Sequence, residues 1–270
     1  MLRKLMKHEF RATARIMGPL YLVLLVTAIC ANISSRVMNR SNNHLLNILS
    51  ALVVMAFVLA IIGVCFMSFA LMLQRFYRNL LRDEGYIMFT LPASVHQQVW
   101  SKLIVSTVWF IVTGAAVLLS CVVAVYQVGF VMDFFRVIGR ILENMTAYYA
   151  LNGTAMVLEL LTLCFAGCVA FALQFYAAMA VGHSFASHKM ALSVAFFFAF
   201  QFVCQIVGTV LLVSLDGSPL FEFLSTLDLH LTAMTAFHVI MCLLLAMVVV
   251  YGAIFYFLTT YFLKKRLNLE

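Results

Sequence analysis

Residues 48–73 read ILSALVVMAFVLAIIGVCFMSFALML, an apolar run without a charged side chain. A bilayer core about 30 Å thick needs about 20 residues of α-helix, at about 1.5 Å per residue, so this run is long enough to cross a membrane. A transmembrane strand would alternate lipid-facing and lumen-facing residues over about ten positions, whereas this run is apolar on every side. It therefore predicts a transmembrane helix.

The same pattern recurs along the chain. The predicted spans are residues 17–33, 48–73, 99–125, 151–181, 190–214 and 235–263. Of the 270 residues, 65% are apolar and 10% are charged, with a mean hydropathy of +1.08, which excludes a soluble globular domain and a disordered chain. The sequence predicts an all-α polytopic integral membrane protein with six transmembrane helices in a single domain over residues 1–270.

The basic residues are divided unequally between the two sides of these spans. On one side lie Arg36, Arg40, Arg136 and Arg140. The other side holds the rest of the 17 Lys and Arg: Arg3, Lys4, Lys7, Arg11, Arg15, Arg75, Arg78, Arg82, Lys102, Lys189, Lys264, Lys265 and Arg266. Positive residues gather on the cytoplasmic side, so we expect both termini in the cytoplasm and the protein in the cytoplasmic membrane. The net charge of +7 then reflects topology, and no nucleic-acid partner is predicted.

The first 16 residues combine an apolar face with a basic one. This pattern is typical of an interfacial helix lying among lipid headgroups, although an ordinary basic flank would show a similar charge. Gly18 and Pro19 are expected to break the helix before the first span. Glu9 is the one acidic residue among these bases.

The most polar cytoplasmic stretch, residues 74–98, joins the second and third spans. It carries both signs of charge together with large apolar side chains, among them Leu80, Leu81, Tyr86 and Met88. Interfaces are enriched in aromatic residues, Met and Arg, so we interpret this stretch as a docking element; the alternative is a connector packed against its own spans. On the other side we expect a surface helix over 127–149 and a re-entrant or interfacial segment over 214–232.

Motifs for catalysis are absent from the sequence. None of its lysines follows a glycine, so a phosphate-binding loop cannot form, and His8-Glu9 lacks the second histidine of a zinc protease. We predict no enzyme activity, cofactor or metal in this chain. His183 and His188 are interpreted as polar loop residues, and the seven cysteines as packing residues within the spans.

Three polar residues inside the spans are candidates for a substrate path. Glu159 is an acid near the outer end of the fourth span, where it could couple transport to protons, reach headgroup water, or pair with Arg136 or Arg140. Gln201 and Gln205 share one face of the fifth span, which could line a polar path or bond to another helix.

The stretch Asp83-Glu84-Gly85-Tyr86-Ile87-Met88-Phe89-Thr90-Leu91-Pro92, with the basic start and the six spans, resembles ATP-binding-cassette (ABC) exporter permeases of the second export class. This stretch is the most specific part of the resemblance and is similar to permeases common in anaerobic Gram-positive bacteria. The resemblance implies a coupling helix in this loop that docks on a separate ABC ATPase. The residues that would face the ATPase are Arg82, Asp83, Glu84, Gly85 and Tyr86, with Glu9 bracing them.

The resemblance also implies an assembly of two permease subunits and two ATPases in the membrane lipid, with a path lined by the second and fifth spans. The substrate and the choice between homodimer and heterodimer stay open. Two other functions also stay open: a proton-coupled secondary transporter using Glu159, and a structural membrane protein without transport. An intramembrane enzyme would need a nucleophile facing a base, which the sequence does not present.

Overall fold

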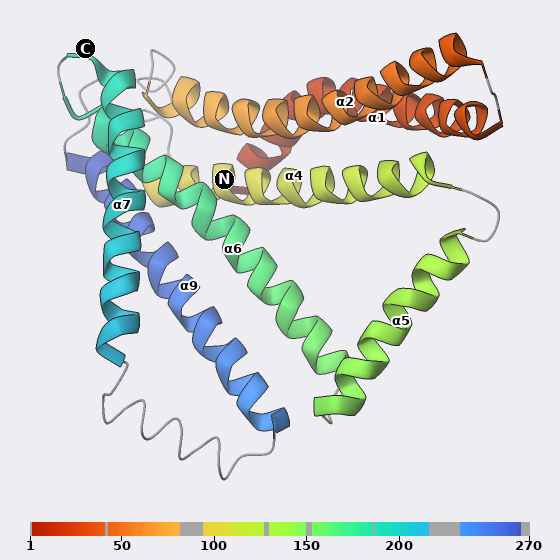
Figure 1. The fold of residues 1–270 in the computed structure, drawn as a ribbon. Helices are drawn as coiled ribbons and strands as arrows, with labels where there is room; N and C mark the ends of the chain where they lie inside the picture. The colour runs from red at the N-terminus through yellow and green to blue at the C-terminus, as the bar shows by residue number, and fades with distance from the viewer. Residues whose placement is uncertain are drawn as a thin grey trace. The chain divides into compact units, whose positions relative to one another are not determined.

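The computed structural model describes residues 2–40, 43–81, 94–126, 130–149, 153–185, 187–215 and 233–265. Within these ranges the chain is helical and contains no β-strand (Figure 1). The α-helices are α1 (Leu2–Arg40), α2 (His44–Phe76), α4 (Val95–Ala124), α5 (Phe130–Tyr149), α6 (Gly153–Gly182), α7 (Lys189–Leu215) and α9 (Ala233–Lys265). Six of them, all except α5, are long and apolar enough to cross a membrane. The predicted all-α fold with six long apolar spans is confirmed.

The described residues group into two compact units. The first comprises residues 1–75 and 100–138, which include α1, most of α2 and most of α4. Its core contains Leu24 and Ala28 of α1 with Phe57 and Val64 of α2, and Cys121 of α4 packs against this cluster. Small residues on α1 let neighbouring helices approach closely, as is common where helices pack in lipid.

The predicted break at Gly18 and Pro19 is wrong, because α1 is a single helix from Leu2 to Arg40. The residues of α1 that are buried explain why the helix continues. They recur at helical spacing on both sides of the proline: Glu9, Thr13, Met17, Leu24, Ala28 and Ala31. Proline removes one backbone donor, but neighbouring helices can compensate for that loss inside a bundle. Packing along one continuous stripe therefore outweighs the local effect of Pro19.

The second unit comprises residues 76–99 and 139–270. In it α6 packs against both α9 and α7. The C-terminal half of α6 is buried almost completely, from Ala172 to Gly182 except for Phe175. A Cβ on Gly252 of α9 would lie 3.7 Å from the Cβ of Ala170, so the two helices meet at small residues.

The predicted loop 74–98 begins and ends in helix. α2 continues to Phe76, a π-helical turn η1 covers Tyr77–Leu81, and α4 begins at Val95. Leu80 and Leu81 are buried, and the ring of Phe76 stacks on Tyr176 with centroids 4.0 Å apart. This first part of the loop therefore packs against its own chain, as in the connector interpretation.

Two predictions concern the segments on the other side of the spans. Most of the segment 127–149, expected to form a surface helix, is helical as α5 (Phe130–Tyr149). Most of the segment 214–232 lies outside the described residues, since α7 ends at Leu215 and α9 begins at Ala233.

Candidate functional site

A buried ion pair joins the beginning of α1 to the beginning of α4. The Lys102 ammonium donates a hydrogen bond to Oε1 of Glu9, and the two side chains are only 5% and 6% exposed. Thr13 continues the contact by donating to the backbone oxygen of Glu9 at 2.7 Å. Phe10 directly follows Glu9 in α1, and Trp109 lies about two turns after Lys102 in α4. The centroids of their rings are 6.3 Å apart. A buried charge is tolerated when it is paired, so this contact stabilises both charges.

A group of hydroxyls lies further along the same helices. Thr113 Oγ1 lies 2.7 Å from the Tyr21 hydroxyl and 2.8 Å from Ser68 Oγ, and it donates to the Trp109 carbonyl. A hydroxyl has one proton to donate, so Tyr21 and Ser68 must both donate to Thr113. The network bonds α1, α2 and α4 to one another. Together with the ion pair, it joins α1 and α4 at two positions along their length.

The residues predicted to face an ATPase are not described by the structure. Arg82, Asp83, Glu84, Gly85 and Tyr86 all fall between Leu81 and Ser94, outside the described ranges. Glu9, the proposed brace, is described and pairs with Lys102. Lys102 lies about two turns into α4, the helix that follows this stretch. Sequence analysis missed this pairing, although a lysine inside the predicted span 99–125 calls for a nearby acid.

Gln201 and Gln205 have different surroundings. The amide nitrogen of Gln174 on α6 donates to Oε1 of Gln201 on α7 at 3.0 Å. This bond matches the interpretation of Gln201 as a link between helices. Gln205 is exposed, and its backbone oxygen accepts a bond from Thr209. Gln201 and Gln205 are both exposed on α7, and Gln201 differs in being bonded to Gln174.

Glu159 is paired with a histidine that sequence analysis did not identify. Nδ1 of His238 on α9 lies 2.7 Å and 2.9 Å from the two carboxylate oxygens of Glu159 on α6. Both side chains are partly exposed, at 25% for Glu159 and 22% for His238. A carboxylate and an imidazole at this distance can share or exchange a proton. His238 lies within the predicted span 235–263, and a polar residue at such a position is itself a signal for a partner.

His183, predicted as a polar loop residue, is instead buried at the turn between α6 and α7. It is 2% exposed, and the ring of Tyr77 approaches it edge-on with centroids 5.2 Å apart. Nδ1 lies 2.8 Å from the Met179 carbonyl and 3.2 Å from Ser193 Oγ. Since Ser193 donates its proton to the Lys189 carbonyl, Nδ1 carries the hydrogen and Nε2 is the unprotonated atom.

The turn closes tightly because residue 182 is glycine. A Cβ at Gly182 would lie 2.3 Å from Ser193 Oγ and 2.5 Å from the Ser193 backbone nitrogen. No side chain fits there, so glycine permits the close approach of α6 and α7 that buries His183. Burial is the main cause that lowers the pKa of His183 below its ordinary value of 6.5, with a smaller contribution from Lys189.

This burial predicts a pH-dependent stability. Folding holds His183 uncharged, so its contribution to stability is fully present above pH 6.5 and is lost as the pH falls from there toward the lowered pKa of the folded protein. The loss for one such proton is at most about 1.4 kcal/mol per pH unit. We expect the melting temperature of the protein in detergent to fall less steeply on acidification in a His183→Gln variant. His188→Gln, which changes an exposed neighbour, is the control. Equal slopes in wild type and His183→Gln would contradict the burial of a neutral imidazole.

A third histidine connects the first turn of α4 to the last turns of α9. Nδ1 of His96 lies 2.8 Å from the Tyr256 hydroxyl, and Nε2 lies 2.8 Å from the Lys264 ammonium. An ammonium only donates, so Nε2 accepts and Nδ1 donates to Tyr256. These three side chains are a structural link at the end of the second unit that sequence analysis did not predict.

Among the described residues no group of three or more His, Cys, Asp or Glu is placed to hold a metal ion. No family model, curated protein or solved structure matches the chain. Fold and site therefore define a class: a helical protein with six helices suited to crossing a membrane, whose buried polar contacts join those helices to one another.

Proposed function

We propose that this chain is the membrane-spanning permease subunit of an ABC exporter of the second export class. It would move a substrate of unidentified chemistry across the cytoplasmic membrane, using ATP hydrolysed by a separate ATPase subunit. Three features support the proposal: the six long apolar helices, the distribution of basic residues, and the resemblance of residues 83–92 to the docking loop of such permeases. The sequence lacks a nucleotide-binding motif of its own, so the ATPase would be a partner.

The observation that carries the proposal is the buried ion pair between Glu9 and Lys102. In an exporter of this class the loop before α4 would receive the movement of the ATPase. A force on that loop would reach α4 directly, because α4 follows the loop in the chain. The ion pair, supported by the Thr113 hydroxyl network, ties α4 to the amphipathic start of α1. The two helices would then move as one body.

The proposed transport step follows from this connection. ATP would bring two ATPases together, the docked loops would follow, and the two permease subunits would change from one rigid arrangement to another. The substrate path would lie between the permease subunits, which form a homodimer or a heterodimer. Gln201 and Gln205, both exposed on α7, would line it, and Gln201 is also bonded to Gln174.

The first experiment is purification of the tagged protein from its native membrane in mild detergent. We expect a cassette ATPase to co-purify in about equal amount and the preparation to hydrolyse ATP, because docking through a buried interface survives mild extraction. Mass spectrometry identifies the partner, and a phosphate-release assay measures hydrolysis. A clean protein without ATPase activity, also after crosslinking, would contradict the proposal.

The Glu159–His238 pair favours a second candidate, a proton-coupled secondary transporter. An intramembrane acid held by a histidine is a common element of proton relays. The two candidates differ in their energy source. Transport that continues in ATP-depleted cells under a constant proton gradient, and stops in Glu159→Gln, would replace the exporter by the secondary transporter.

A further inference from the structure

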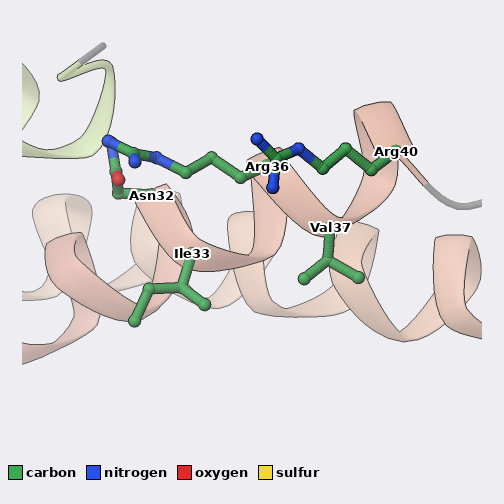
Figure 2. Close-up of a pocket in the computed structure, with 5 residues that line it drawn as sticks. All are labelled: Asn32, Ile33, Arg36, Val37 and Arg40. Atoms are coloured by element: carbon green, nitrogen blue, oxygen red, sulfur yellow. The ribbon is translucent and has the colours of Figure 1, made fainter. Parts of the chain in front are cut away.

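A pocket of about 600 Å³ lies along the end of α1 that is far from the N-terminus (Figure 2). Its lining residues are Asn32, Ile33, Arg36, Val37 and Arg40, none of which is acidic. Figure 2 shows the three polar side chains in a row, with both arginines reaching back along the helix toward its N-terminus. Ile33 and Val37 lie beside this row and are exposed. The pocket thus combines two cations with an apolar wall.

Arg36 is held in place by the end of α4. Its Nη2 donates to the Tyr126 carbonyl at 2.7 Å. Asn32 donates to the same carbonyl at 2.8 Å and to the Ala124 carbonyl at 3.0 Å, so together the two side chains cap the last turn of α4. A guanidinium has several further N–H donors that this single bond leaves unused. Arg36 is therefore fixed in position and still able to bind an anion.

Arg40 lies one turn further along α1, on the same side as Arg36. Among the described residues neither arginine pairs with a carboxylate, whereas Arg136 of α5 donates to Asp133 at 2.9 Å. Two guanidinium groups in a row match the geometry of a phosphate, which arginine binds through paired N–H donors.

The position of the pair along α1 points to the source of the phosphate. The predicted first span ends at residue 33, so Arg36 and Arg40 follow directly where the hydrocarbon layer ends and the headgroups begin. Ile33 and Val37 supply an apolar surface next to the two cations. We propose that Arg36 and Arg40 bind the headgroup phosphate of an anionic phospholipid, whose acyl chain lies against Ile33 and Val37.

Native mass spectrometry of the delipidated protein, titrated with phosphatidylglycerol or phosphatidylcholine, tests this site. We expect the wild type to retain phosphatidylglycerol preferentially. The double variant Arg36→Gln/Arg40→Gln is expected to lose about tenfold in that retention, since it removes both charge-assisted contacts. Arg136→Gln/Arg140→Gln on α5, a pair with the same spacing, is the matched control and should retain the lipid as the wild type does.

Arg40→Gln alone keeps the test valid if the double variant fails to fold, because Arg40 makes no side-chain hydrogen bond to the described residues. Unchanged lipid retention in Arg40→Gln would overturn the proposal. An equal loss in the control pair on α5 would also overturn it, since a general attraction between positive protein and negative lipid would then account for the binding.

Competition with inorganic phosphate distinguishes a lipid from a soluble anion. A large excess of phosphate is expected to leave phosphatidylglycerol bound, because free phosphate lacks the apolar contact of the acyl chain. Displacement of the lipid by phosphate would show that the site binds a soluble anion, and would overturn the lipid assignment. The result does not depend on whether the protein is an exporter.

Discussion

Glu84→Arg is expected to abolish ATP-driven export while the protein still reaches the membrane. In the proposed exporter, Glu84 faces the ATPase from the loop between α2 and α4. Reversing its charge would set like charges against each other at a docking surface, which costs several kcal/mol. A loss of this size weakens the complex on the order of a hundredfold or more. Substrate export from cells and recovery of the ATPase with the tagged permease measure the two consequences.

The matched control for this variant is Asp133→Arg on α5. Asp133 is an exposed acid that pairs with Arg136 within one helix, and such surface pairs contribute little to stability. We expect normal export and normal recovery of the ATPase in Asp133→Arg. Export at the wild-type level in Glu84→Arg would show that the loop between α2 and α4 does not couple ATP hydrolysis to transport. That conclusion would hold for a transporter of any class.

The helices could be predicted from the sequence because each depends on a long local pattern. Uncharged runs such as 48–73 have few alternatives to a transmembrane helix, and α2 covers all of that run. The prediction at Pro19 failed because it weighed a local signal alone. Whether a helix continues through proline depends on what packs around it, and the buried stripe through Met17 and Leu24 becomes visible only when α2 and α4 are in place.

The candidate site was less predictable because it consists of contacts between distant residues. Glu9 and Lys102, like Glu159 and His238, meet through packing of helices that are far apart in sequence. The sequence marks such residues as polar positions in apolar surroundings, but it does not say which of them meet. His183 shows the same limit: its burial depends on the close approach of Ser193 to Gly182.

Lys102→Met is expected to destabilise the protein by about 3–5 kcal/mol, because it removes the buried cation that bonds the Glu9 carboxylate. Glu9→Met should have a similar effect, because it removes the buried carboxylate that bonds the Lys102 ammonium. The double variant Glu9→Met/Lys102→Met removes both charges and should recover most of the loss, since apolar side chains can replace a buried pair at little cost. Unfolding the purified protein in detergent with heat or denaturant measures the stability of all three variants.

The exposed pair of Asp133 and Arg136 supplies the control for these variants. Arg136→Met should change the free energy of unfolding by less than about 0.5 kcal/mol, because the ion pair that it removes is open to solvent. A change in the free energy of unfolding for Lys102→Met as small as that for Arg136→Met would contradict the burial of the ion pair between Glu9 and Lys102.

The double variant Glu9→Met/Lys102→Met also separates stability from transmission of movement. An apolar contact is not directional, so two methionine side chains at these positions could keep α1 and α4 packed while allowing them to slide past each other. We therefore expect the double variant to be stable and to bind the ATPase, yet to export several-fold less per ATP hydrolysed, because the Thr113 hydroxyl network is then the remaining polar link that carries the movement of α4 to α1. Full export in that stable variant would reduce the pair to a structural contact and leave the loop alone as the coupling element.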